Sequence, residues 1–216
     1  MKRFLPILIL AAAGLVSACA SPSEVTRNAP TGVFGMGATA TEAGPGPTSA
    51  QVQDWDLAQL VVNVPQTLTV SEENRIKPRS DIVWHGDPYG NRYAQVTQVM
   101  SQPLQSTLAR MDGDMPVIVR LDVTRFHAQT PRVRYTFGGE HEIEFDLTVI
   151  DATTGRVLMG PTHHDLTFRA YGGDEALAAE ARGMGQRERI QGRMSQWALQ
   201  EFGLLGTNEA IPDIGS

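Results

Sequence analysis

Cysteine and lysine are almost absent from this sequence of 216 residues. Cys19 is the only cysteine, so the chain forms no internal disulfide and its folded part must be held together by packing. Lys77 is the only lysine after the first few residues, and no phosphate-binding loop surrounds it. The Gly-x-Ser-x-Gly and His-Glu-x-x-His patterns of hydrolases are missing as well. We therefore expect neither a cofactor nor a nucleotide, and we assign no catalytic residue.

Long apolar runs are missing too, since none reaches the roughly 18 to 20 residues that a membrane-spanning helix requires. The longest, residues 4–16, follows Lys2 and Arg3 and precedes small residues, which is the pattern of a secretory signal peptide. Val16-Ser17-Ala18-Cys19 matches the lipobox of bacterial lipoproteins, in which the cysteine is acylated and the chain is cut before it. We predict a signal peptide over 1–18 and fatty acids such as palmitate on Cys19. An ordinary signal peptide beside a chance cysteine is the alternative.

The acidic charge of the chain indicates which part of the protein contacts the membrane. Without Lys2 and Arg3, 16 basic residues stand against 24 acidic ones, which gives the mature chain a net charge of −8. Anionic headgroups and nucleic acids repel such a protein, so we expect no nucleic-acid partner and a membrane contact through the lipid alone. Two or three acyl chains make this contact effectively permanent, because each buried methylene contributes about 0.8 kcal/mol. Ala20 occupies the position where Asp retains enteric lipoproteins at the inner membrane, so we expect the outer membrane, facing the periplasm.

The composition divides the mature chain into three parts. Residues 19–53 are rich in Ala, Ser, Thr, Pro and Gly and are predicted to form a flexible tether. A tether of this length has an r.m.s. span of about 30 Å. One folded domain is expected over 54–206, followed by a disordered tail over 207–216.

Hydrophobic spacing predicts a small α+β domain over 54–206. Apolar residues recur with helical spacing over 92–111, where Pro103 should kink or restart the helix, and Asp174 is expected to cap a later helix. Segments that alternate between apolar and polar residues are typical of strands covered on one face. The predicted strands are 57–64, 117–124, 142–149, 157–159 and 166–170, with a loop over 81–90 and a break at Gly160-Pro161. We therefore predict a sheet of about four antiparallel strands with two helices packed on one face, in the order β-α-β-β-β-α.

Four short motifs resemble an uncharacterised family of alphaproteobacterial lipoproteins. They are 81–88 with the following Gln95-Val96, Arg125-Phe126-His127, 134–139 and 151–155. The resemblance covers most of residues 55–203 and implies no activity, since none is assigned to the family. The order of elements is also similar to that of small periplasmic lipoproteins that assist transport or assembly machines of the outer membrane, an analogy of fold only.

Histidines and acids on the later strands have both a functional and a structural interpretation. His163, His164 and Asp165, joined by His127 or His141, offer metal ligands. Adjacent residues of a strand point to opposite faces and do not share a metal easily, so we expect no metal site.

A row of acids offers paired carboxylates for glycosidase chemistry. It consists of Glu140, Glu142, Glu144 and Asp146. Two such groups would have to face each other across a cleft, whereas a row of acids on a strand is more typical of a solvated face.

Arginine and aromatic residues gather around the loop between two predicted strands. They are Arg125, Arg132, Arg134, Tyr135 and Phe137. Guanidinium groups beside aromatic rings suit an anionic or protein partner, with pairing to the glutamate-rich strand as the alternative. Ile82, Trp84 and Tyr89 allow a second partner surface unless Trp84 lies in the core.

We predict a membrane-anchored, non-catalytic accessory or binding module of the cell envelope with envelope proteins as partners. A hydrolase of envelope material such as cell-wall glycan is the alternative.

Overall fold

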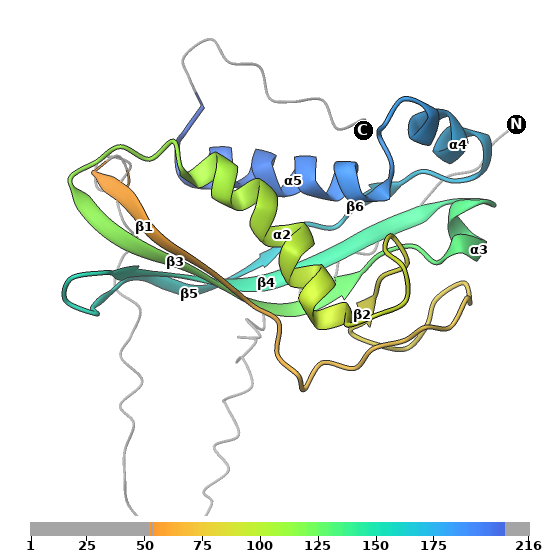
Figure 1. Cartoon of the computed structure of the whole chain (residues 1–216), viewed down its shortest axis with the longest axis horizontal. Helices are drawn as coiled ribbons and strands as arrows, with labels where there is room; N and C mark the ends of the chain where they lie inside the picture. Colours follow the sequence, from red (N-terminus) through yellow and green to blue (C-terminus); the bar gives the residue numbers. More distant parts are fainter. Residues whose placement is uncertain (1–51, 53, 206–216) are drawn as a thin grey trace, which may run out of the picture. The chain divides into compact units, whose positions relative to one another are not determined.

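The computed structural model describes residues 52 and 54–205, which form one sheet with helices packed against it (Figure 1). The strands are β1 (Trp55–Asn63), β2 (Ile82–Val83), β3 (Met115–His127), β4 (Gly139–Asp151), β5 (Val157–Asp165) and β6 (Phe168–Ala170). The helices are α2 (Arg92–Leu108), α3 (Pro131–Arg134), α4 (Gly173–Ala181) and α5 (Gln186–Glu201). Cys19, the predicted signal peptide and tail, and nearly all of the predicted tether lie outside the described residues.

The sheet is about four strands wide, although six strands contribute to it. Its central pair, β3 and β4, runs antiparallel. β1 and β2 lie one after the other along the outer edge of β3, and β5 and β6 do the same along β4. β1 and β2 run parallel to β3, so the sheet is mixed and the prediction of a purely antiparallel sheet was wrong on this edge.

The parallel pairing of β1 with β3 follows from the helix that lies between them in the chain. α2 begins after Asn91, whose side chain accepts a hydrogen bond from the N–H of Ala94, and it carries the chain back before β3 begins. Such a crossover lets the second strand run in the same direction as the first, whereas antiparallel neighbours need only a hairpin. α2 runs unbroken through Pro103 to Leu108, so the restart expected there does not occur.

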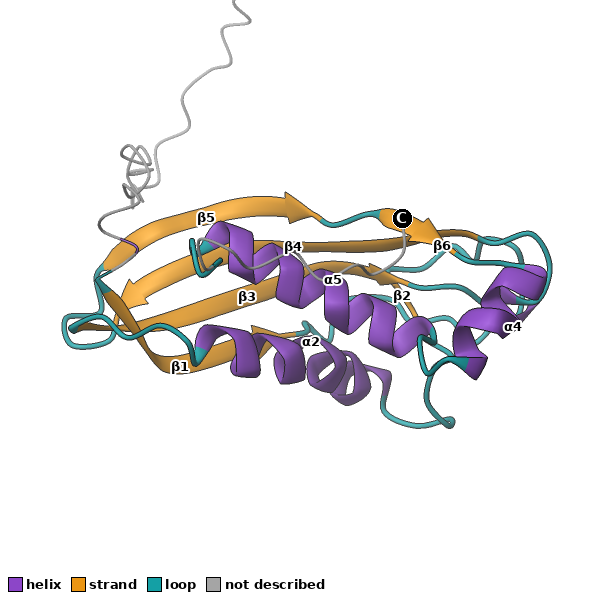
Figure 2. Ribbon diagram, turned by 90° about the horizontal axis from the view of Figure 1, so that it is seen from above, coloured by secondary structure: helices purple, strands orange, loops and turns teal. Residues whose placement is uncertain are grey.

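α2 and α5 lie side by side on one face of the sheet, which confirms that part of the predicted architecture (Figure 2). In β4 every second residue from His141 to Asp151 is buried toward the helices. β3 alternates in the same way from Val117 to Val123, and a bulge at Thr124 then shifts the alternation by one residue, so that Phe126 and not Arg125 is buried. Between residues 54 and 205, no helix is long and apolar enough to cross a membrane.

Three local features differ from the sequence prediction. The segment 81–90, expected to be a loop, contains the short strand β2. β5 continues through Gly160-Pro161, where a break was expected, because an edge strand with register irregularities tolerates a proline. Asp174 lies in the first turn of α4, where its negative charge suits the helix dipole, while Gly172 occupies the cap position.

Candidate functional site

A groove opens at one end of the sheet, between α3 and the loop that precedes β2. Its volume is about 330 Å³, and its walls include Ile76, Lys77, His127, Phe137, Glu140 and Glu142. Ile76 is 56% exposed and Phe137 is 66% exposed. Two large apolar side chains that face water at one groove are typical of a surface that another molecule covers. This end groove is the candidate functional site.

Hydrogen bonds fasten the loop that carries Ile76 to α3. The hydroxyl of Thr130, the residue that caps α3, donates to the carbonyl oxygen of Arg75 at 2.7 Å. The N–H of Arg132 donates to the side-chain oxygen of Asn74, also at 2.7 Å. The two walls of the end groove are therefore joined, although they come from distant parts of the chain.

Phe137 is presented by the turn between α3 and β4. Gly138 follows it with a φ of 78°, a backbone conformation that favours glycine, and donates its N–H to the carbonyl oxygen of Val133. A Cβ at Gly138 would lie 2.8 Å from the carbonyl oxygen of Ala170, so a larger residue does not fit. Gly138 in the motif 134–139 thus has a structural role, which is to turn the chain where Phe137 is displayed.

The charged groups beside the groove neutralise one another. Lys77 Nζ donates to Glu142 Oε1 at 2.6 Å, and Arg125 Nε donates to Glu142 Oε2 at 2.6 Å. Burial by itself raises the pKa of Glu142, but the hydrogen bonds from the two cations outweigh burial and hold this pKa below its usual value. Glu142 is therefore ionised at neutral pH, a state suited to pairing with cations and not to donating a proton.

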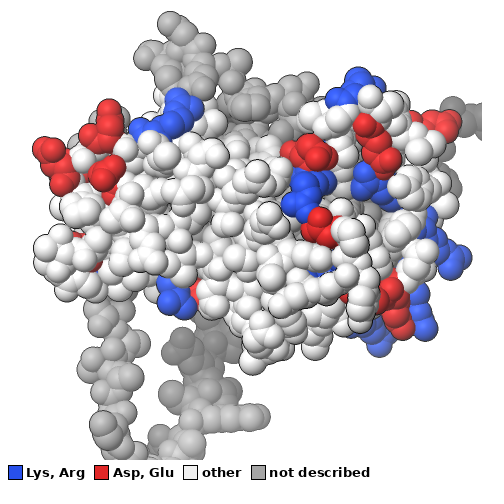
Figure 3. Space-filling view, viewed as in Figure 1, with Lys and Arg blue, Asp and Glu red and all other residues white. Residues whose placement is uncertain are grey.

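The structure separates the five residues predicted as a partner surface, which are Arg125, Arg132, Arg134, Tyr135 and Phe137. Arg125 pairs with Glu142, and Arg134 pairs with Glu180 of α4, so both guanidinium groups are engaged within the molecule. Arg132, Tyr135 and Phe137 are exposed and accessible to a partner. Basic and acidic side chains lie interspersed over the end of the molecule that holds α3 and α4 (Figure 3).

The other wall of the groove was not identified from the sequence. Residues 71–80 are polar apart from Ile76 and Pro78, and the segment was interpreted only as a polar connection. A lone isoleucine in such a stretch was the available signal. Its meaning depends on Phe137 lying across the groove, which the sequence does not show.

His163 and His164 point to opposite faces of β5, as predicted. His163 Nδ1 lies 3.0 Å from Asp146 Oδ1 on the open face of the sheet. On the helix side, His164 stacks on Phe145 and accepts a hydrogen bond from Trp197 Nε1 at 3.3 Å, and burial lowers its pKa. Within residues 54–205, no cluster of three His, Asp, Glu or Cys side chains is arranged to hold a metal ion.

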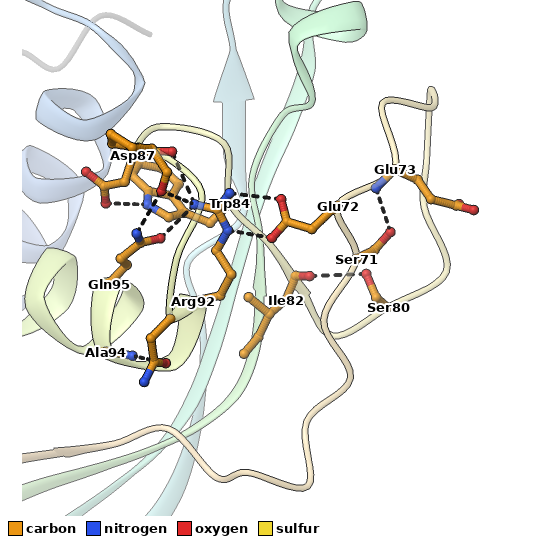
Figure 4. Close-up of polar contacts among 12 residues, drawn as sticks. Ser71, Glu72, Glu73, Ser80, Ile82, Trp84, Asp87, Arg92, Ala94 and Gln95 are labelled. Carbon is orange, nitrogen blue, oxygen red and sulfur yellow. Dashed lines mark hydrogen bonds and ion pairs between the residues drawn. The ribbon is translucent and has the colours of Figure 1, made fainter.

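The motif 81–88 connects both long helices to the sheet (Figure 4). Trp84 is fully buried and donates from Nε1 to the Asp87 carboxylate at 2.7 Å. That carboxylate also pairs with Arg187 in the first turn of α5. Arg92, at the start of α2, donates to the carbonyl oxygen of Asp87 at 3.2 Å. Trp84 is therefore a core residue and not part of a partner surface, although Tyr89 nearby is 85% exposed.

A family model matches residues 55–212, which include every strand and helix described above. The chain belongs to DUF6778, a family of unknown function. No curated protein matches the chain.

Several solved structures are similar to this DUF6778 member at low identity. A Caulobacter crescentus protein provisionally described as a lipoprotein is 13% identical, with a TM-score of 0.38, over 72% of this chain and 92% of its own. A Xanthomonas campestris protein of the DUF330 family is 13% identical, with a TM-score of 0.40, over 70% and 83%. PelC of Paraburkholderia phytofirmans, described as a dodecamer, is 10% identical, with a TM-score of 0.30, over 71% and 92%. At TM-scores below 0.5, these likenesses carry no argument about function.

Proposed function

We propose that this DUF6778 member is a lipoprotein anchored to the outer membrane and facing the periplasm, where it is a non-catalytic accessory module that binds a partner protein. Its anchor rests on the sequence, in which the only cysteine, Cys19, ends a lipobox behind an apolar segment. Its binding role rests on one structural observation, the end groove with Ile76 and Phe137 exposed beside it.

The position of the groove supports this proposal. The rings of Trp55 and Phe202 pack edge to face with centroids 6.4 Å apart, so the first strand begins and the last helix finishes at the same end of the domain. α3, which contributes Val133 to the lining of the end groove, lies at the other end (Figure 1). A tether that joins the domain just before Trp55 therefore attaches away from the groove, and anchoring and binding do not compete for one surface.

The chemistry of the groove indicates the kind of partner segment. Ile76 and Phe137 supply apolar contact area, while Lys77 is already paired with Glu142 and adds little net charge. Buried aromatic and aliphatic side chains at the centre of an interface contribute most of the binding free energy, and paired charges at its rim contribute little. The proposed partner segment therefore inserts one or two apolar side chains between Ile76 and Phe137.

Site-specific photo-crosslinking in cells tests the binding role. A photo-reactive residue replaces Phe137 or Ile76, and the control position is Val157, which is 53% exposed on the β4–β5 hairpin at the other end of the domain. We expect the same envelope protein to crosslink from both groove positions and not from Val157. Identical products from all three positions, or none from the groove at normal expression, would contradict a binding role for the end groove.

A separate experiment tests the anchor. Cys19→Ser removes the sulfur that carries the acyl chains, so we expect the variant to leave the membrane fraction and to lose the fatty-acid mass seen on the native protein. Phe137→Ser is the control, because it changes the groove and leaves the anchor intact. The anchor is disproved if the serine variant stays with the membranes and the native protein carries no fatty acid.

A further inference from the structure

A second, smaller cavity lies where the start of β4 meets the start of α5. Its volume is about 10 Å³, which is room for a single small occupant. Its walls include Gln129, Arg134, His141, Gly185, Gln186 and Arg189. Only Gln129 also borders the end groove, so the two hollows have different linings. We name this hollow the α5 cavity.

Two buried nitrogen atoms at the α5 cavity have no hydrogen-bond partner in the described part of the chain. They are Nδ1 of His141 and Nε2 of Gln129, and the two residues are 1% and 5% exposed. The nearby Gln186 Oε1 accepts from the backbone N–H of Gln129 at 3.0 Å and from neither of these two nitrogens. Buried polar groups in proteins are nearly always paired. Two unpaired ones at a single cavity therefore indicate an occupant that is not part of this chain.

Positive charge surrounds the cavity. Arg134 and Arg189 line it, and its lining contains no Asp or Glu. The pKa of His141 falls to about 3, first because the ring is buried and then because of the charges on Arg189 and Arg134. The imidazole is therefore neutral and lies within the electrostatic field of both guanidinium groups.

The start of α5 adds to this field. Gly185 occupies the N-cap position and has no side chain to accept a hydrogen bond from the first turn. Glu188 lies in that turn and Glu180 pairs with Arg134, so both acids are near, but neither lines the cavity. The backbone of α5 therefore reinforces the positive character of the cavity wall.

The occupant must accept hydrogen bonds. Gln129 Nε2 donates, and a neutral His141 ring donates from Nδ1 when it carries its proton there. The lining contains Arg134 and Arg189 and no carboxylate, so its charge favours an anion over a neutral water molecule. We propose that the α5 cavity is a binding site for one small anion of the size of chloride, which accepts hydrogen bonds from His141 Nδ1 and Gln129 Nε2.

Bromide, a heavier substitute for chloride, locates the site directly. Crystals of the full-length protein are grown in sodium bromide, and an anomalous difference map is calculated at the bromine absorption edge. We expect a peak in the α5 cavity within hydrogen-bond distance of His141 Nδ1 and Gln129 Nε2. A cavity that holds only water, without anomalous signal, overturns the proposal.

A chloride titration at constant ionic strength, with gluconate as the bulky replacement anion, tests the site in solution. The melting temperature of the full-length protein should rise by about 3–5 °C at ten times Kd and then continue to rise with the logarithm of the chloride concentration. Gln129→Glu places a carboxylate where the anion binds and should abolish this rise, while the control Gln102→Glu on the exposed surface of α2 should retain it. An equal chloride-dependent rise in Gln129→Glu, or a melting temperature in gluconate alone that equals the one in chloride, refutes the site. If Gln129→Glu fails to fold, the bromide map decides.

Discussion

Gly86 lies against the ring of Trp84, which makes it a sensitive position in the motif 81–88. A Cβ at Gly86 would lie 2.3 Å from two carbon atoms of the Trp84 ring, whereas ordinary van der Waals contacts begin near 3.4 Å. The ring must therefore move by about 1 Å or more to admit one methyl group. Trp84 has no free space for this movement, because it is fully buried and packs edge to face on Phe126 at 5.7 Å.

We expect Gly86→Ala to destabilise the domain by about 2–4 kcal/mol. Overpacking a core by one methyl group costs about 1–3 kcal/mol, and displacement of the ring weakens the 2.7 Å hydrogen bond from Trp84 to the charged Asp87, which contributes about 1.5–3 kcal/mol. The stiffer unfolded chain offsets about 0.4–1 kcal/mol of this loss.

Gly90→Ala is the matched control in the same loop. A Cβ at Gly90 would make its tightest contact, at 3.2 Å, with the flexible end of the Gln95 side chain, and it would lie 3.8 Å from the carbonyl oxygen of Pro88, an ordinary distance, so we expect a change within about 0.5 kcal/mol. Urea unfolding followed by tryptophan fluorescence measures both variants, and the Gly86→Ala midpoint should fall without a change in slope. If the two variants differ by less than about 1 kcal/mol, the ring of Trp84 is not confined as described.

Three further predictions concern an ion pair, the core and the groove. Glu72→Gln should cost about 1 kcal/mol at pH 7, a modest value because Glu72 is 37% exposed, although its partner Arg92 is buried. The Arg92 hydrogen bond holds the pKa of Glu72 below its usual value, so this contribution is present above the ordinary carboxyl range and is lost as pH falls through the folded-state pKa. Urea curves of wild type and variant should differ at pH 7 and converge below the ordinary carboxyl range, and curves that coincide at pH 7 would show that the pair is unimportant. Phe145→Ala should cost about 3–5 kcal/mol in urea unfolding, because the ring is fully buried against Trp197, and a loss below 1 kcal/mol would contradict this packing. Phe137→Ser should leave the melting temperature within about 2 °C of wild type while it abolishes crosslinking from a photo-reactive residue at position 76. A large loss of stability would show that Phe137 belongs to the core.

The helices and the central strands could be predicted because their buried residues recur every two to four positions along the chain. The buried residues of α2 repeat at helical spacing, and those of β4 alternate strictly from His141 to Asp151, so one face of each element is visible in the sequence. The direction of β1 could not be obtained in this way. A strand that pairs in parallel and one that pairs antiparallel can show the same alternation, and α2 between β1 and β3 was the only local indication of a crossover.

The candidate site was predictable only in part. Tyr135 and Phe137 were selected from the sequence, and the structure exposes both. Arg125 and Arg134 were selected with them, but their acidic partners come from other elements, Glu142 of β4 and Glu180 of α4. Neither pairing follows from local spacing.

The sequence by itself determined the features that depend on neighbouring residues. These are the apolar stripe of α2 and the turn that begins at Asp151, whose carboxylate accepts hydrogen bonds from two following N–H groups. The predicted acylation of Cys19 also rests on neighbouring residues alone, the apolar segment 4–16 and the motif that ends at Cys19. Only the tertiary structure decided the parallel edge of the sheet, the end groove and the α5 cavity. Each of these forms only where segments far apart in the chain meet. His141 Nδ1, for example, becomes a buried atom without a partner only after those segments have packed around it.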